Sequence, residues 1–202
     1  MVSPLLSWFA GNARKLPWRD DPTAYHVWVS EIMLQQTRVE AVKPFYARFI
    51  GTLPDVKALA GCPEDQLLKL WEGLGYYNRV RNMQKAAQIA VESYDGKMPT
   101  DYGTLLSLPG IGSYTAGAVA SIAGGQAVPA VDGNVLRVIS RICGSEADIA
   151  KQSVKRGMEE TLLEVIPADA PGSFNQALME LGATVCLPNG APECSRCPAL
   201  HL

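Results

Sequence analysis

The chain has 202 residues, 48% of them hydrophobic, and a formal net charge of −2. This composition suffices for a packed core and excludes an intrinsically disordered chain. Its apolar runs fall short of the ~18 residues that a membrane span requires, and the N-terminus lacks the features of a secretory signal, so we expect a cytoplasmic location of bacterial type. The slight acidity argues against binding nucleic acid through overall charge, although a local basic patch is compatible with such binding.

Helical periodicity runs along nearly the whole chain. Residues 24–36 are apolar on most faces, as in a buried helix, and later segments repeat apolar residues at intervals of three and four. These segments cover residues 66–71, 80–91, 105–108, 115–123, 135–142 and 154–165. Turn-forming glycines and prolines lie between them. No run alternates over the length of a strand, so the pattern predicts an all-α protein of about ten helices with short loops.

Glu31 lies inside the apolar segment 24–36, where a charged side chain is costly unless it is paired or protonated. Desolvation at such a place is expected to raise the pKa of its carboxyl, which is what a general acid needs near neutral pH. The local pattern fits equally well a glutamate that faces solvent or forms a structural ion pair.

Residues 108–117 read LPGIGSYTAG and predict a tight turn between two helices, the second beginning near Ser113. Gly110 and Gly112 permit positive φ and a close approach of the backbone to a partner. The unpaired amides at the start of the second helix form an anion site suited to a DNA phosphate. An ordinary helix–helix turn is the alternative, but the complete motif favours contact with DNA.

Asp132 lies in the sequence VDGNV and is expected to cap a helix that starts at Gly133 or Asn134. Capping is compatible with a second role, because an ionised carboxylate also stabilises a positive charge that develops nearby. Glu31 is distant in the sequence, so only the fold can bring the two carboxyl groups together.

Six ordered motifs resemble the catalytic domain of MutY-type adenine DNA glycosylases, of the helix-hairpin-helix superfamily. They are LPWR, VWVSEIMLQQTRV, LWEGLGYYNRVRN, LPGIGSYTAGAVAS, VDGNVLRV and FNQALMELGATVC. The resemblance implies two helical domains with an active-site cleft between them. One would span residues 24–132, with the helix-hairpin-helix at 105–123, and the other would combine residues 1–23 with 133–202. The implied partner is double-stranded DNA that contains a mispaired adenine, bound by a monomer.

The same resemblance implies the chemistry. Glu31 would protonate the adenine leaving group at N7, and Asp132 would stabilise the oxocarbenium-like sugar. Asn134 would position Tyr114, Asp132 or water. Direct attack by water and a short-lived covalent link to Asp132 are both compatible with this scheme. Tyr114 stands where endonuclease III-like enzymes carry a nucleophilic lysine, so we expect removal of adenine opposite 8-oxoguanine or guanine without an efficient lyase step.

An adenine inside a duplex must be flipped into a pocket before its bond is cleaved. The resemblance assigns six residues to that pocket, namely Arg14, Trp18, Arg19, Leu34, Val39 and Gln176. It makes Gln36 and Tyr76 wedges beside the opposite, oxidised guanine. Local pattern alone favours plain packing for Trp18 and Tyr76. The family's C-terminal domain, which helps to recognise 8-oxoguanine, is not in this sequence, so a reduced preference for that partner is expected.

Three of the five cysteines, Cys186, Cys194 and Cys197, resemble ligands of the family's 4Fe-4S cluster. The first gap holds seven residues, one more than is usual, and the fourth ligand would be expected just after Leu202. Either the chain ends short of that cysteine, or the cluster is incomplete or absent. Zinc on the three cysteines and His201 is a weaker alternative.

Three other functions are open to a chain of this kind. A bifunctional enzyme for oxidised pyrimidines is disfavoured by Tyr114 at the lysine position. A DNA-binding module without catalysis is disfavoured by the presence of both Glu31 and Asp132. A cluster-bearing scaffold explains the cysteines but not the other motifs.

Overall fold

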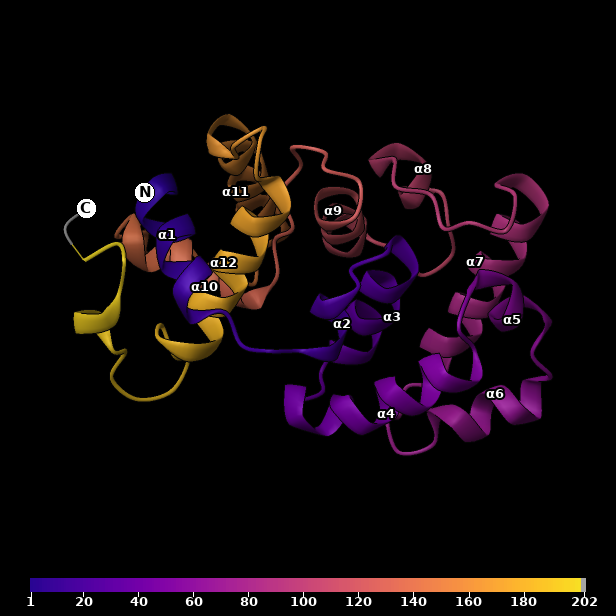
Figure 1. The fold of residues 1–202 in the computed structure, drawn as a ribbon. Coiled ribbons are helices and arrows are strands. Elements are labelled where there is room, and N and C mark those ends of the chain that lie inside the picture. The colour runs from indigo at the N-terminus through magenta and orange to yellow at the C-terminus, as the bar shows by residue number, and fades with distance from the viewer. Residues whose placement is uncertain (201–202) are drawn as a thin grey trace. The chain divides into compact units, whose positions relative to one another are not determined.

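A computed structural model describes residues 1–200, and the chain divides into two compact units (Figure 1). The central unit spans Lys15–Gly124, and the terminal unit combines Met1–Arg14 with the residues from Gly125 onward. Within the described residues the regular structure consists of twelve α-helices and one short 3-10 helix. The expected all-α class is therefore confirmed. No helix in this part of the chain is long and apolar enough to cross a membrane.

The unit boundaries fall earlier in the sequence than residues 24 and 132. Residues 15–23 belong to the central unit, because helix α2 (Pro17–Asp20) packs against the two helices that follow it. Residues 125–132 belong to the terminal unit, where the backbone N–H of Ala130 donates to Asn175 (3.0 Å).

The central unit is organised around helix α3 (Ala24–Leu34). Of the residues from Tyr25 to Met33, all but His26 are buried, as the apolar pattern predicts for a core helix. Helix α3 packs against α2, α4 and α9. The other helices of the unit are α4 (Val39–Thr52), α5 (Val56–Gly61), α6 (Glu64–Trp71), α7 (Asn78–Ser93), α8 (Tyr102–Leu106) and α9 (Ser113–Ile122).

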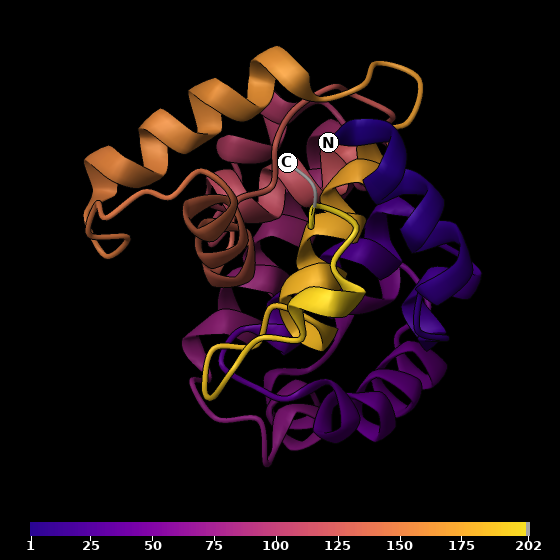
Figure 2. The ribbon, with the colours of Figure 1, turned by 90° about the vertical axis from the view of Figure 1, so that its left-hand side faces the viewer.

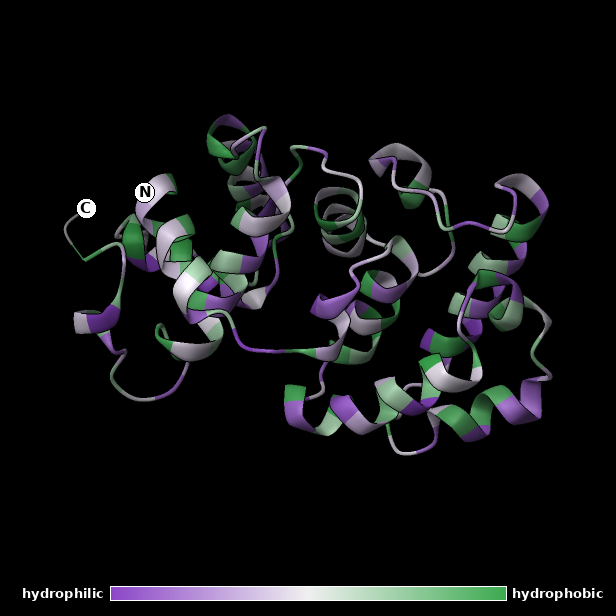
Figure 3. Cartoon of the chain, viewed as in Figure 1, coloured by the Kyte–Doolittle hydropathy of each residue, from purple (hydrophilic) through white to green (hydrophobic). Residues whose placement is uncertain are grey.

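Helices α4 and α6 are amphipathic, with hydrophobic and hydrophilic residues both represented along them (Figure 3). Their apolar residues meet in the core, where the rings of Phe49 and Trp71 pack edge to face with centroids 6.0 Å apart. Both side chains are fully buried. Aromatic packing of this kind adds to the free energy gained from burying the rings.

The terminal unit joins the two ends of the described chain. Helix α12 (Pro171–Thr184) packs against α1 (Val2–Asn12) and α10 (Gly133–Ile142), and α11 (Gln152–Val165) packs against α10. Helices α1 and α12 lie side by side in two views at right angles (Figures 1 and 2). The core between these helices is apolar and includes Leu5, Val135, Leu162, Phe174, Leu178 and Leu181.

Helix α3 ends at Leu34, two residues before the end of the expected segment. Gln36 instead has a φ of 62°, in the left-handed region. The carbonyls of Ile32 and Gln35 accept hydrogen bonds from Arg79 (2.7 and 2.8 Å). A side chain from another helix therefore satisfies carbonyls at the end of α3, where the intrahelical bonding pattern runs out.

An ion pair between a partly exposed arginine and a buried carboxylate fastens the N-terminal segment to α12. Arg14 donates from Nε to Oε1 of Glu180 (2.6 Å) and from Nη2 to Oε2 (3.0 Å), and its backbone N–H also donates to Oε1 (3.1 Å). The Glu180 side chain is 1% exposed. Because a buried carboxylate without a cationic partner is costly, the position of Arg14 is fixed by Glu180.

We predict that Arg14→Met lowers the free energy of unfolding by about 2–3 kcal/mol, because it removes two charge-assisted hydrogen bonds to the buried carboxylate of Glu180. The double variant Arg14→Met/Glu180→Leu is expected to recover much of this loss, because it removes the buried charge as well. Chemical denaturation of the three proteins measures the difference. A single variant as stable as the unchanged chain would show that the pair contributes nothing.

Candidate active site and nucleic-acid interface

The buried carboxyl of Glu31 is held by a tyrosine. Glu31 lies on α3 and is 7% exposed, and the phenol of Tyr114 donates a hydrogen bond to its Oε2. Tyr114 is half-buried in the first turn of α9, which packs directly against α3. The structure thus brings two of the predicted catalytic residues together. It does so in surroundings that exclude most water from the carboxyl group.

The predicted hairpin is formed by α8, a turn and α9. Gly110 in the turn has a φ of 78°, and a Cβ added there would lie 2.8 Å from the Cβ of Asn82. Both the left-handed backbone and this close approach require glycine. Gly112 is the N-cap of α9, where no side chain caps the helix, and both glycines are exposed. The first turn of α9 therefore begins at a positively polarised helix end that suits a phosphate.

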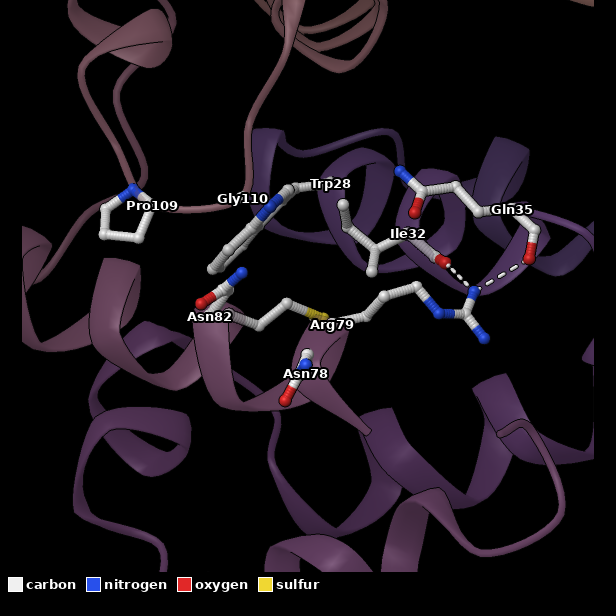
Figure 4. Close-up of a pocket in the computed structure, with 9 residues that line it drawn as sticks. Trp28, Ile32, Gln35, Asn78, Arg79, Asn82, Pro109 and Gly110 are labelled. Atoms are coloured by element: carbon white, nitrogen blue, oxygen red, sulfur yellow. Dashed lines mark hydrogen bonds between the residues drawn. The ribbon is translucent and has the colours of Figure 1, made fainter. Parts of the chain in front are cut away.

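A small cavity lies beside the hairpin turn (Figure 4). Its volume is about 120 Å³, and it is lined by Trp28, Ile32, Gln35, Asn78, Arg79, Asn82, Met83, Pro109 and Gly110. Its lining therefore combines the end of α3, the first half of α7 and the turn. The indole N–H of Trp28 has no hydrogen-bond partner among the described residues. A cavity lined by amides and a guanidinium can accommodate ordered water that satisfies such a group.

Asp132 caps α10, as predicted from the sequence. Its Oδ1 accepts from the backbone N–H of Val135 (2.8 Å), and its Oδ2 accepts from Nδ2 of Asn134 (2.8 Å). The Oδ1 of Asn134 in turn accepts from Nη2 of Arg137 (2.9 Å). Asn134 therefore orients the Asp132 carboxylate and is itself oriented by an arginine.

Two arginines of α10 tie the first cysteine of the C-terminal group to this helix. Arg137 donates from Nε to the carbonyl of Cys186 (2.9 Å) and from Nη2 to the carbonyl of Gly182 (2.8 Å). Arg141 donates from Nη1 to the carbonyl of Leu187 (2.8 Å) and lies 3.3 Å from the Cys186 sulfur. Because Arg137 also contacts Asn134, hydrogen bonds run without a break from Asp132 to Cys186.

The three C-terminal cysteines do not form a ligand set within the described residues. Cys186 and Cys197 are half-buried, and Cys194 is exposed in the 3-10 helix Cys194–Arg196. No group of three metal-ligating side chains gathers in this part of the chain. His201, the alternative zinc ligand, lies outside the described residues. A four-thiolate cluster needs one ligand more than these three thiols supply, and we derive no step of the chemistry through one.

The central unit contains four of the residues assigned to a base pocket. Trp18 on α2 is 6% exposed, and its ring packs edge to face on Tyr46 at 5.4 Å, so most of its surface contributes to the core. Arg19 follows it on α2, and Leu34 and Val39 end α3 and begin α4. These last three side chains are half-buried.

The terminal unit contains the other two assigned residues. Arg14 makes the ion pair with Glu180 described above, a contact that no local sequence pattern predicted. Gln176 is half-buried on α12. Its neighbour Asn175 is fully buried and was also missed, although a polar residue within an apolar helix is a signal of a buried contact. Asn175 donates from Nδ2 to the carbonyl of Val128 (2.9 Å) and so helps to fix the segment that leads to Asp132.

Gln36 and Tyr76, the two assigned wedge residues, are both exposed and both have left-handed backbone conformations. Their φ angles are 62° and 46°. The Tyr76 side chain is 69% exposed, so it is available to a partner rather than packed in the core. Both residues belong to the central unit, as do Glu31, Tyr114 and the hairpin.

The family of the chain follows from comparison with known proteins. Residues 29–164 match the model of the HhH-GPD superfamily of base excision DNA repair proteins. The match covers more than half of the chain and includes both α3 and the hairpin. The chain belongs to this family.

Several curated relatives are adenine DNA glycosylases. The chain is 46% identical to that of Mus musculus over 99% of its own length, 46% identical to that of Homo sapiens over 98%, and 39% identical to that of Buchnera aphidicola subsp. Schizaphis graminum over 98%. It covers 40%, 38% and 57% of the lengths of these relatives. The chain thus spans about two fifths of the length of the mammalian relatives.

Solved structures share the fold. A thermostable thymine-DNA glycosylase matches with a TM-score of 0.87 and 28% identity, covering 98% of this chain and 91% of the other. Endonuclease III in a non-covalent complex with DNA matches with a TM-score of 0.79 and 25% identity, covering 98% and 89%.

We predict that Gly182→Ala destabilises the terminal unit. A Cβ at this position would lie 2.6 Å from the Cβ and 3.2 Å from the Cα of Asn134, so α12 and α10 would have to separate. Overpacking of this kind lowers the free energy of unfolding by about 1–3 kcal/mol.

The matched control is Gly157→Ala on α11, where an added Cβ meets nothing within 4 Å. That variant should be as stable as the unchanged chain or more stable by about 0.5–1 kcal/mol, because alanine favours helix. Thermal and denaturant unfolding of the two variants compare the sites. Equal stability of both variants would contradict the predicted clash.

Proposed function

We propose that the chain is the catalytic part of an adenine-specific DNA glycosylase, acting as a monomer on duplex DNA in which adenine is mispaired with 8-oxoguanine or guanine. The observation that carries this proposal is the shielded carboxyl of Glu31 and its hydrogen bond from Tyr114, beside a hairpin suited to a phosphate. The relatives named adenine DNA glycosylase support the choice of base.

The proposed reaction is hydrolysis of the bond between adenine N9 and the sugar C1′. Glu31 donates a proton to N7, the N9–C1′ bond breaks, and its electron pair leaves with the base. The hydrogen bond from Tyr114 to Oε2 holds the Glu31 carboxyl in place for this transfer. A neutral base is a much better leaving group than an anionic one, and transfer by a positioned side chain accelerates such a step by about 10²–10⁴-fold.

The sugar gains positive charge as the base leaves. Asp132 is proposed to stabilise this charge as a carboxylate, held by Asn134 and by the cap of α10. Water then adds to C1′ and passes its proton to Glu31, which restores the acid. A short-lived ester of Asp132 with C1′, later hydrolysed by water, balances the same atoms and is the alternative route.

Tyr114 is proposed to limit the reaction to base removal. A lyase of the lysine type requires an amine that forms a Schiff base with C1′, and a phenol cannot form one. Here the phenol instead donates to the proposed acid.

The bases of the mispair are proposed to be handled by two sets of residues. Gln36 and Tyr76 enter the base stack beside the guanine, and the exposure of both side chains supports this role. The extruded adenine is taken by the side chains assigned to the base pocket, among them Gln176, whose amide can pair with a base edge.

We also propose that Cys186, Cys194 and Cys197 bind an iron–sulfur cluster together with a fourth ligand from outside the described residues. The resemblance of these three positions to the ligands of the family's cluster supports this proposal. Iron and acid-labile sulfide in purified protein would support the cluster, and their absence from fully active protein would rule it out.

We predict that Glu31→Gln lowers the single-turnover rate of adenine release at least about 100-fold, because the amide cannot supply the proton. Release is measured on duplexes that carry adenine opposite 8-oxoguanine or guanine. The unchanged chain should act on both, with a modest preference for 8-oxoguanine. The control Glu92→Gln alters an exposed glutamate of α7 and should retain full activity.

Adenine release by Glu31→Gln at the unchanged rate would overturn the role of Glu31. No release by the unchanged chain from either duplex would overturn the proposed function itself. A large preference for 8-oxoguanine would show that residues 1–202 suffice to recognise the oxidised base.

We predict that borohydride traps no appreciable covalent adduct between the chain and these duplexes, because Tyr114 has no amine. Endonuclease III on a duplex with an oxidised pyrimidine serves as the positive control. An adduct of the chain as abundant as that of the control would favour a bifunctional enzyme.

A further inference from the structure

Two exposed residues from distant parts of the central unit share an uncommon backbone conformation. Gln36 follows α3 and Tyr76 precedes α7, and both have left-handed φ angles (62° and 46°). Residues other than glycine rarely adopt this conformation, and where they do the surrounding structure must hold them. The structure therefore needs a group that fixes both segments.

Arg79 on α7 is that group. Its Nη1 donates to the carbonyls of Ile32 (2.7 Å) and Gln35 (2.8 Å), as Figure 4 shows. Its Nη2 donates to the carbonyls of Leu74 (2.9 Å) and Gly75 (3.3 Å). One guanidinium therefore bridges the end of α3 and the segment that precedes α7.

The positions of two of these carbonyls explain how the left-handed conformations of Gln36 and Tyr76 are stabilised. The Gln35 carbonyl belongs to the peptide unit that precedes Gln36, and the Gly75 carbonyl belongs to the unit that precedes Tyr76. The orientation of the preceding peptide plane sets the φ angle of a residue. By bonding to both carbonyls, Arg79 fixes both planes and with them the directions in which Gln36 and Tyr76 project.

Aromatic rings complete the enclosure of the guanidinium. Its carbon lies 5.4 Å from the ring centroid of Trp71 and 5.8 Å from that of Tyr76. The indole N–H of Trp71 also donates to the Gly75 carbonyl (3.0 Å). Tyr76 is thus held through its peptide plane and through its ring.

We propose that Arg79 is the positioning residue for the DNA wedge, holding Gln36 and Tyr76 at a fixed separation so that both enter the base stack together. The inference rests on the proposed function, because it takes these two residues as the wedge. Arg79 does not touch the reacting atoms in this scheme. It acts by keeping two strained loops in the conformation that extrusion of the adenine requires.

Lysine cannot replace this arginine. The guanidinium is a planar fork with five donors, which allows it to bond to carbonyls on two sides at once, whereas an ammonium is a compact point charge. Arg79→Lys therefore keeps the positive charge and removes the bridge. The variant therefore distinguishes a role of Arg79 in positioning the wedge residues from a role of its charge in attracting the DNA backbone.

The matched control is Arg48→Lys. Arg48 donates from Nη2 to the carbonyl of Leu70 (3.1 Å) and lies over the ring of Phe45 at 5.0 Å, so it loses similar contacts. It contacts neither wedge segment. The first measurement is backbone amide hydrogen exchange of the two variants. Residues 35–37 and 74–77 should exchange faster in Arg79→Lys but not in Arg48→Lys. The amides of α3 and α9 should stay protected in both variants.

The second measurement compares two DNA duplexes. One carries adenine opposite guanine, and the other carries adenine opposite a tetrahydrofuran abasic analogue, where no opposing base has to be displaced or contacted. Arg79→Lys is expected to lose adenine release from the first about 10- to 100-fold more than from the second, because a misplaced wedge matters most where the adenine has an opposing base to be separated from. Arg48→Lys should lower neither.

Equal losses on the two duplexes, or unchanged exchange in both segments, would overturn the positioning role. If the unchanged chain releases adenine from neither duplex, the proposed function fails, and faster exchange in Arg79→Lys would still show that Arg79 holds the two loops.

Discussion

One buried carboxyl group in the central unit lies between two apolar helices and therefore needs a hydrogen-bond partner there. Helix α3 is buried on almost every face, and Glu31 takes its place among residues that lie in the core. A polar group at this depth requires a partner, and Tyr114 supplies it from α9, the helix that packs on α3. The tyrosine stands two residues after the N-cap glycine of α9, so the bare helix end and the bonded carboxyl belong to one short segment.

Two arginine side chains form hydrogen bonds that connect segments distant from one another in the sequence. In the central unit Arg79 gathers carbonyls from two loops, and in the terminal unit Arg137 gathers Asn134, Gly182 and Cys186. Burial lowers the pKa of both guanidinium groups from its ordinary value, because low-dielectric surroundings disfavour the charged form. Each guanidinium donates hydrogen bonds to at least two backbone carbonyl oxygens.

Local patterns in the sequence were sufficient to predict the helical class, the burial of α3, the hairpin and the cap at Asp132. Each of these depends on neighbours within a few positions, and a single sequence displays those neighbours directly. The end of α3 was placed two residues too late, because its cause is Arg79, a side chain from another helix. The partner of Arg14 was missed for the same reason, since Glu180 lies near the other end of the chain. The assignments of the base pocket came from family resemblance, and no local signal in this sequence would have provided them.

The cap at the start of α10 limits what a substitution at Asp132 can reveal. Each oxygen of this carboxylate already accepts one hydrogen bond, from the Val135 amide and from the Asn134 side chain. An asparagine in its place has a single acceptor oxygen, and its NH₂ group would meet one of these two donors head on. Such a protein would lose a negative charge and one of these two hydrogen bonds in one change. The charge of Asp132 and the order of the first turn of α10 are therefore coupled, and a change at this position alters both.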